Sequence, residues 1–235
     1  MDKLKSFKSS SIFLPLVALA ILVIFNIIFV PGFLDVEITQ DGRLYGRVFD
    51  ILNRSSSLII LSLGMTFVIA TAGIDISVGA VVAISGAVCC SLIGGRGDGV
   101  AEYPMVVAMI AAIATGVVCG MWNGFLVAKI KIQPMVVTLI LMVAGRGIAQ
   151  LLTEGQIITV YYAPFSYIGG NIPGNIIPSP IIIAILMIAL VVFILKKTSL
   201  GLFIQSVGIN PTASRYAGIN VALIIFLVYA FSGFC

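Results

Sequence analysis

The sequence contains no histidine, and only 9% of its 235 residues are charged. The missing histidine excludes HExxH metalloproteases, Ser-His-Asp triads and most transition-metal sites. The four cysteines, at positions 89, 90, 119 and 235, form no CxxC pair, so neither a disulfide framework nor a zinc site is indicated. A GxxxxGK[ST] phosphate loop is also absent. We therefore expect no metal, no cofactor and no ATPase within this chain.

The scarcity of charge points to a membrane protein. Apolar residues make up 60% of the chain, the mean hydropathy is +1.21, and a soluble domain would carry roughly 25% charged residues. The basic residues are scattered over short loops, which does not suit nucleic-acid binding. Since a spanning helix needs about 20 apolar residues, we expect a single all-α domain over residues 1–235. Its predicted architecture is a polytopic transmembrane helical bundle with about seven spans.

Seven apolar runs are the candidate spans. The first follows Lys3, Lys5 and Lys8, as in a signal peptide, but it is longer than a signal core and ends in Val-Pro-Gly-Phe, which favours a retained anchor. The runs cover about residues 11–30, 55–71, 76–93, 103–128, 135–152, 176–195 and 219–235.

The basic residues predict the orientation of the chain. A cytoplasmic N-terminus places eight of them inside: Lys3, Lys5, Lys8, Lys129, Lys131, Lys196, Lys197 and Arg215. The outer side then receives four: Arg43, Arg47, Arg54 and Arg96. This bias agrees with the positive-inside rule. The outer segments 31–54 and 153–175 are candidate contact surfaces or simply solvated loops.

Glycines recur every four residues in the fourth run, at Gly116, Gly120 and Gly124. On a helix they form one smooth ridge, which lets another helix approach closely. Gly79, with Ala83 and Ala87, begins a similar row in the third run. Both rows predict tight helix packing.

Asp75 lies among glycines between the second and third runs, with Ser77 two residues later. The segment is either a tight cytoplasmic turn or a broken helix inside the membrane, where irregular backbone is tolerated only if protein buries it or water reaches it. Asp75 is then either the N-cap of the third helix or a residue of a passageway, because intramembrane ionisable residues are functional candidates.

Arg146 stands about twelve residues into the fifth run, where a charge costs roughly 3 kcal/mol. It should face protein or water, with Asp75 or Glu154 as the acids that could pair with it. Asn123 and Gln133 add polar groups near the inner end of the fourth run and the loop after it. Such groups bind sugar hydroxyls or simply join helices.

The longest predicted cytoplasmic stretch covers residues 196–218. Asn210 and Pro211 open a short helix through Ser214, Arg215 and Tyr216. A helix lying on the inner face suits docking to a soluble partner, although it is also typical of an ordinary surface helix.

Three segments carry a family resemblance: TAGIDISVGAVVAISGA (71–87), WNGFLVAKIKIQPMVVTLILMVAGRGIAQ (122–150) and GLFIQSVGINPTASRYAGINV (201–221). They resemble the permease subunits of bacterial ABC sugar importers of the ribose and galactose type, from the first span to the last residue. Within that family, segments 40–54 and 141–159 look most like the permeases of galactofuranose importers.

The resemblance implies a multi-pass permease of the bacterial inner membrane that forms the path for a monosaccharide. Its partners would be a cytoplasmic ABC ATPase subunit, a periplasmic sugar-binding protein and a second permease, as a homodimer or heterodimer. The family's ATPase-coupling loop motif is matched by Gly208, Asn210, Ala213, Arg215 and Gly218.

Family members continue beyond the YAFSGFC ending of this sequence with further hydrophobic segments and a glycine-rich stretch. We therefore expect a C-terminally incomplete permease. Three alternatives stay open at this stage: a truncated subunit or scaffold that does not transport, an importer of another sugar such as ribose, and an intramembrane enzyme that uses Asp75. The enzyme is disfavoured because a second carboxylate, a histidine or a metal set is missing.

Overall fold

The computed structural model describes residues 13–35, 37–38, 44–94, 103–160, 162–170 and 177–235, and within these it is almost entirely helical. The basic residues at positions 3, 5, 8, 43 and 96 lie outside this part of the chain. The elements are α2 (Phe13–Phe29), β1 (Glu37–Ile38), β2 (Leu44–Tyr45), α3 (Arg47–Ala70), α4 (Val78–Gly94), α5 (Met105–Phe125), the π-helix η1 (Leu126–Ile130), α6 (Pro134–Leu152), α7 (Ala163–Gly169), α8 (Ser179–Lys197), α9 (Ser199–Ile209), α10 (Pro211–Tyr216) and α11 (Val221–Phe234).

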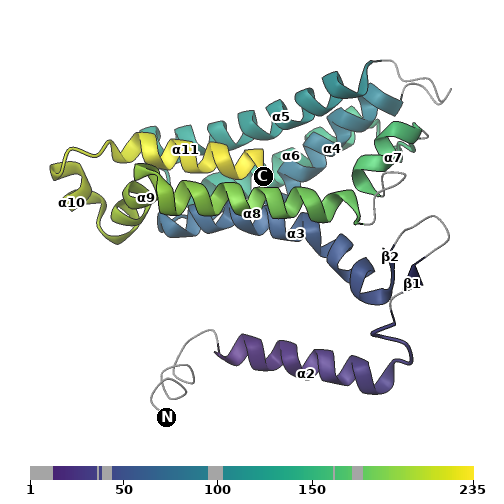
Figure 1. Ribbon diagram of the computed structural model, residues 1–235. Helices are drawn as coiled ribbons and strands as arrows, with labels where there is room; N and C mark the ends of the chain where they lie inside the picture. The colour runs from purple at the N-terminus through teal and green to yellow at the C-terminus, as the bar shows by residue number, and fades with distance from the viewer. Residues whose placement is uncertain (1–12, 36, 39–43, 95–102, 161, 171–176) are drawn as a thin grey trace, which may run out of the picture.

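The apolar helices form an elongated bundle whose long members run back and forth along one axis (Figure 1). α11 packs along α5 and α3, α4 lies between α5 and α6, and α3 also packs against α8. The short helices α9 and α10 close one end of the bundle, and α7 lies at the other (Figure 1). β1 and β2 are a two-residue antiparallel pair, with Glu37 opposite Tyr45. The predicted all-α membrane bundle is confirmed.

Each of the seven predicted apolar runs overlaps one apolar helix. Among the described residues, four helices are long and apolar enough to cross a membrane: Arg47–Ala70, Met105–Ile130, Pro134–Leu152 and Ser179–Lys197. α2 and α4 have 17 residues each and α11 has 14. For these three shorter helices, spanning stays a prediction.

The second predicted run begins too late. We placed Arg47 and Arg54 in the preceding loop, whereas α3 begins at Arg47 and includes both. The side chains of Asp50 and Arg54 stand one turn apart on this helix and form an ion pair of 3.0 Å. Polar pairs at this spacing support a helix without adding hydropathy, so a search for apolar residues missed the first turns.

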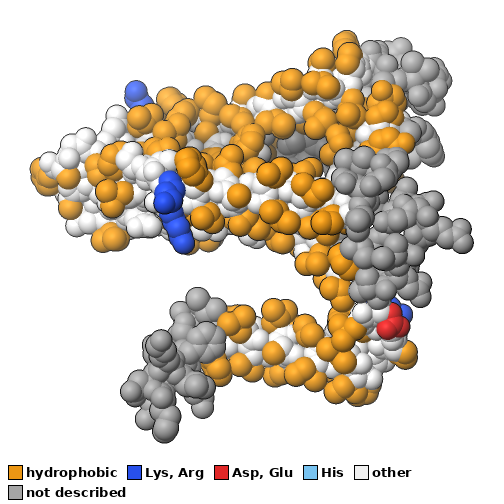
Figure 2. All heavy atoms as spheres, viewed as in Figure 1, with side chains coloured by type: hydrophobic (Ala, Val, Ile, Leu, Met, Phe, Trp, Pro, Cys, Tyr) orange, Lys and Arg blue, Asp and Glu red, His pale blue; other side chains and the backbone are white. Residues whose placement is uncertain are grey.

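α2 lies apart from the rest of the bundle (Figure 1) and buries none of its residues. Figure 2 shows its surface covered by apolar side chains, as is the visible face of the bundle. Lipid is the medium in which such a surface is stable.

Two groups of buried apolar side chains form the interior. The larger joins α3, α8, α9 and α11 around Phe67, Val68 and Val228, with Tyr229 fully buried among them. The smaller joins α4 and α5 around Ile93 and Ala108. A buried polar cluster, from which the candidate site is built, joins α5 and α11 to the chain between α3 and α4.

Candidate functional site

The chain between α3 and α4 is a non-helical segment of seven residues, Thr71–Ser77, which begins with a turn at Thr71 and Ala72 and which we call the extended segment. The chain leaves α3 through Ala72, which has the left-handed conformation (φ 58°). The Ala72 amide donates to the Ile69 carbonyl and the Gly73 amide to the Val68 carbonyl, both at 2.9 Å. This is the Schellman arrangement that closes helix C-termini. A Cβ on Gly73 would lie 2.9 Å from Tyr229 Oη, so only glycine fits there.

The extended segment is held by side chains of the protein. Tyr229 of α11 donates a hydrogen bond of 3.2 Å from its hydroxyl to the Ile74 carbonyl. Thr71 and Asp75 are buried, and Ser77 is fully inaccessible. Irregular backbone at membrane depth requires such partners. The segment is therefore buried by protein, and both alternatives for it, a tight turn and a broken helix inside the membrane, stay predictions.

Asp75 is the centre of a hydrogen-bond network that joins three segments. Its Oδ1 accepts from the Ser77 amide at 2.9 Å and from Ser77 Oγ at 2.6 Å. Its Oδ2 accepts from Ser232 Oγ of α11 at 3.3 Å. Asn123 of α5 donates from Nδ2 to Ser77 Oγ at 2.9 Å. Three of the predicted site residues, Asp75, Ser77 and Asn123, are therefore brought together.

The N-cap interpretation of Asp75 was wrong. α4 begins at Val78, and the Ala80 and Val81 amides donate to the Ser77 carbonyl. Asp75 lies two residues before the capping position and binds Ser77 rather than the free amides of the first helical turn. Its carboxylate thus shapes the extended segment.

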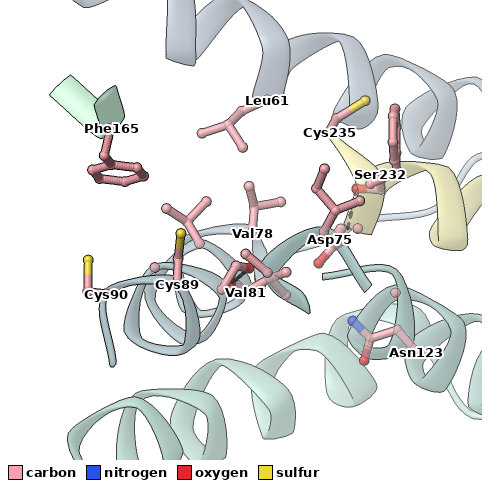
Figure 3. Close-up of a pocket in the computed structure, with 18 residues that line it drawn as sticks. Leu61, Asp75, Val78, Val81, Cys89, Cys90, Asn123, Phe165, Ser232 and Cys235 are labelled. Atoms are coloured by element: carbon pink, nitrogen blue, oxygen red, sulfur yellow. Dashed lines mark hydrogen bonds between the residues drawn. The ribbon is translucent and has the colours of Figure 1, made fainter. Parts of the chain in front are cut away.

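A cavity of about 350 Å³ lies beside this network. In Figure 3, Asp75, Asn123 and Ser232 lie on one side of it, and Cys89, Cys90 and Phe165 lie on the other. Its lining comes from α3, α4, α5, α7 and α11 and is mostly apolar. The polar contribution is therefore concentrated at the Asp75 side.

Sequence reasoning missed Tyr229 and Ser232. Both lie in the last apolar run, more than 150 residues beyond the groups that they contact. A signal was present, because two polar groups three residues apart share one face of an otherwise apolar helix. Their buried state, at 0% and 7% exposure, shows that this face of α11 is internal.

Arg146 and Gln133 do not join the network. Both side chains are exposed, Gln133 immediately before α6 and Arg146 within it. Neither Asp75 nor Glu154 pairs with Arg146, and the single ion pair within the described ranges is that of Arg54 with Asp50. The expected intramolecular partner of Arg146 is absent from that part of the chain because its side chain lies on the outer surface of α6.

The glycine row of α5 faces α11. A Cβ on Gly116 would meet the Gly233 carbonyl oxygen, and one on Gly120 would meet the Tyr229 carbonyl oxygen. On Gly124 it would lie 2.9 Å from the Phe226 carbonyl oxygen. The two backbones are thus in direct contact. Gly79 differs, since nothing lies within 4 Å of its Cβ position, which corrects the close approach that we expected there.

The predicted short helix after Asn210 is present as α10, and its two ends are well defined. Asn210 Oδ1 accepts from the Thr212 and Ala213 amides, both at 3.0 Å, which is N-cap geometry. At the other end, Gly218 has φ +85°, and the Gly218 and Ile219 amides bond to the Arg215 and Ser214 carbonyls. This is a second Schellman ending, at a position that favours glycine.

α10 presents its outer surface to the surroundings. Ser214 is its one buried residue, whereas Tyr216 is 89% exposed and the preceding Ile209 is 86% exposed. Ala213 and Arg215 are also exposed. Such a protruding mixed surface is suited to a protein contact.

α9 anchors this end of the molecule to α3. A Cβ on Gly208 would coincide with the Ala70 carbonyl oxygen and would lie 3.5 Å from Thr71 Cα. Ala70 is the last residue of α3, and Thr71 begins the extended segment that carries Asp75. α10, α9 and the polar network are therefore linked by direct contact and a short stretch of chain.

Basic side chains stand at both ends of the bundle, with more of them at the end where α9 and α10 lie. Lys196 and Lys197 end α8 near α9, and Lys129 lies in η1, which packs against α11. Arg47 and Arg54 lie in the first turns of α3 at the other end (Figure 1).

Among the described residues, no group of three or more histidine, cysteine or acidic side chains is arranged to hold a metal ion.

Comparison with known proteins places this bundle in a family. Residues 47–235 match the family model described as "Branched-chain amino acid transport system / permease component". The chain is 46% identical over 222 residues to the galactofuranose transporter permease protein YtfT of Escherichia coli K12, covering 94% of this chain and 62% of that protein.

Two further relatives are also permeases. The fructose import permease protein FruF of Bifidobacterium longum is 38% identical over 239 residues, and the ribose import permease protein RbsC of Haemophilus influenzae is 35% identical over 223. The alignments cover 98% and 93% of this chain and 64% of each relative. The chain thus spans less than two thirds of the length of these relatives. No solved structure matches it. Together with the helical membrane bundle, these matches show that the chain belongs to the permease-component family of ABC transporters.

Proposed function

We propose that this chain forms part of the translocation path of an ATP-driven importer for a monosaccharide. Galactofuranose is the first candidate because the relative with 46% identity is named for it, and ribose and fructose follow from the other names. A periplasmic binding protein would deliver the sugar, and a second permease would complete the path. A cytoplasmic ATPase subunit would hydrolyse ATP.

We further propose that residues 1–235 act as one permease domain with the N-terminus in the cytoplasm. The lysines and arginine at the α9–α10 end support this orientation, because positive charge favours the cytoplasmic side. On this orientation, residues 196–218 form the cytoplasmic coupling loop, with α10 as its outermost element.

The observation that carries the proposal is the contact between Gly208 and the end of α3. A force applied to α10 passes through α9 to Ala70 and Thr71, where no side chain separates the backbones. From there the extended segment leads in four residues to Asp75, at the wall of the 350 Å³ cavity. An ATPase docked on α10 would thus act directly on the cavity wall.

The outer surface of α10 is the proposed docking site. Ile209 and Tyr216 offer apolar area, and Arg215 offers a positive charge without an ion-pair partner in the described part of the chain. Arginine and tyrosine are common anchors of protein interfaces. The partner surface should therefore combine an apolar groove with a carboxylate.

A charge reversal tests this docking. Arg215→Glu should weaken binding of the importer's ATPase subunit to the chain in nanodiscs about tenfold, because an interfacial charge pair becomes a repulsive one. Arg54→Glu is the matched control at the opposite end and should leave binding unchanged. Affinity is measured by biolayer interferometry, and membrane insertion of each variant by carbonate extraction.

Transmission is tested separately with Gly208→Leu, which forces α9 away from Ala70. In the reconstituted importer we expect ATPase binding to persist while sugar-stimulated ATP hydrolysis falls several-fold. Equal binding by the Arg215 and Arg54 variants would place the docking site elsewhere. Full sugar stimulation in the Gly208 variant would show that the contact with α3 does not carry the signal.

A further inference from the structure

We propose that Asp75 is the hydroxyl-binding residue for sugar in the 350 Å³ cavity, with its Oδ2 oxygen accepting a hydrogen bond from a sugar hydroxyl group. This inference rests on the importer function proposed above and names the group that recognises the substrate. The acceptor site lies where the extended segment Thr71–Ser77 meets α5 and α11.

The hydrogen bonds of Asp75 leave acceptor capacity on one oxygen. All of its partners are donors, two on Oδ1 at 2.9 and 2.6 Å and one on Oδ2 at 3.3 Å. A carboxylate offers about four acceptor positions, so Oδ1 is filled while Oδ2 holds one long bond. Asp75 and its Oδ2 partner Ser232 both line the cavity (Figure 3).

No cation neutralises this buried group within the described residues. Asp75 is 6% exposed, and the single ion pair in that part of the chain lies far along α3, at Asp50 and Arg54. An acidic side chain at membrane depth without a cationic partner is costly. Hydrogen bonds from a ligand would compensate part of that cost while the ligand is bound.

Asn123 supplies a second, independent observation. Ser77 Oγ has one proton and donates it to Asp75 Oδ1, so it can only accept from Asn123. The Asn123 amide must therefore turn Nδ2 towards Ser77, as Figure 3 shows with its nitrogen on the side of Asp75. Its Oδ1 is left buried without a hydrogen-bond partner and points away from Asp75 (Figure 3), so within this network Asn123 acts as a donor that holds Ser77, and through it Asp75, in place.

A spare acceptor beside an apolar cavity fits a polyol better than a metal ion. Calcium and magnesium need about six oxygen ligands, and the described chain provides no group of metal-ligating side chains. A sugar offers hydroxyl donors on one edge and C–H groups on its faces. The apolar lining, which includes Phe165 and Phe234, suits those faces, and the volume lies within the range of about 300–1,000 Å³ for small-molecule sites.

The native cysteines allow a direct test. Cys89, Cys90 and Cys235 line the cavity, whereas Cys119 does not. The full chain in nanodiscs is treated with N-ethylmaleimide, and the alkylation rate of each cysteine is followed by mass spectrometry with galactose, ribose or hydroxyl-free tetrahydropyran present. We expect each sugar to slow alkylation of Cys90 in a saturable manner, with tetrahydropyran inert and Cys119 unaffected.

Asp75→Asn is the decisive variant. The two donors of Ser77 hold the amide oxygen at the Oδ1 position, so an NH₂ group replaces Oδ2 and the acceptor is lost. The sugar concentration for half-protection should rise about tenfold, as for a lost hydrogen bond to a charged group. Ser85→Ala is the matched control, because Ser85 lines the same cavity while its hydroxyl is bonded to the Val81 carbonyl.

Galactoses that lack one hydroxyl group allow a test on the unmodified chain, which does not depend on whether the Asp75 variant folds. On the unmodified chain, at least one of these deoxygenated sugars should protect Cys90 about tenfold less well than galactose. In the Asp75 variant, where it folds, that sugar and galactose should protect Cys90 equally. Equal protection by galactose in Asp75→Asn and the unmodified chain would overturn the site and leave the importer proposal standing. An absence of protection in the unmodified chain would also overturn it, whereas the importer proposal depends on the separate ATPase measurements.

Discussion

α5 and α4 carry the same spacing of small residues in different surroundings. In α5, the Cβ positions of Gly116, Gly120 and Gly124 are occupied by the backbone of α11. In α4, the Cβ positions of Gly79 and Gly86 face open space, with nothing within 4 Å. One row is a contact between two helices; in α4, Gly79 and Gly86 meet no neighbour, although Ala87 is buried and Gly86 lines the 350 Å³ cavity.

The comparison shows what a small-residue row can predict. Residues four apart share a face of a helix, so the sequence establishes that the face is smooth. Which neighbour covers it depends on how α4 and α5 are rotated within the bundle. Predictions about the two rows should therefore differ in size, and even in sign.

The largest effect is expected for Gly120→Leu. The new side chain would need the space occupied by the Tyr229 carbonyl oxygen, so α5 and α11 must separate. We expect a loss of about 3 kcal/mol or more in the free energy of unfolding, at the upper end of overpacking costs. Steric-trap or SDS unfolding of the chain in bicelles measures it.

Gly79→Leu is the matched control for this substitution, with the same change on the open row. Its stability should stay close to that of the unmodified chain. Equal losses in both variants would show that the difference between the rows does not exist in the membrane. Equal tolerance would mean that α5 and α11 are not in backbone contact.

A smaller effect is expected from the opposite side of the contact. A Cβ on Gly233 of α11 would meet the Gly116 carbonyl oxygen and lie 3.0 Å from Gly120 Cα. Gly233→Ala should therefore cost about 1–3 kcal/mol, since one methyl group is accommodated by a slight shift of the helix. The thermal midpoint in detergent reports it. Gly147→Ala, at an open position of α6, should not lower that midpoint.

Most of the fold could be predicted because membrane helices are recognised by the length of their apolar runs. The boundaries failed where a helix is polar, as at the start of α3 with Asp50 and Arg54. The extended segment was recognised as irregular because it combines Gly73 and Asp75 with a very short apparent turn. Its length of seven residues could not be predicted, because the side chain that holds it, Tyr229, lies more than 150 residues further along the chain.

The candidate site was predictable only residue by residue. Asp75 and Asn123 were identified because polar groups are rare in apolar runs, but their connection through Ser77 spans 46 residues between Ser77 and Asn123. It requires a particular rotation of α5, which hydropathy does not specify. Ser232 escaped notice because serine hydroxyls in membrane helices commonly bond to their own helix, as Ser85 does.

The smallest effect, and the one of opposite sign, is expected for Gly86→Ala. Gly86 lies inside α4 with nothing within 4 Å of its Cβ position, so a methyl group meets no neighbour. Alanine also loses less backbone freedom than glycine when a helix forms, and the difference is about 0.5–1 kcal/mol in favour of the variant. The isolated chain in bicelles should therefore be slightly more stable, with a raised thermal midpoint.

The same variant measured in native membranes together with its transport partners sharpens the comparison between α4 and α5. A gain in both settings would mean that the face of α4 stays open in the assembly. A gain in the isolated chain with a loss in the assembly would show that another helix approaches α4 at Gly86, as α11 approaches the glycine row of α5. A loss in the isolated chain itself would contradict the open surface at Gly86.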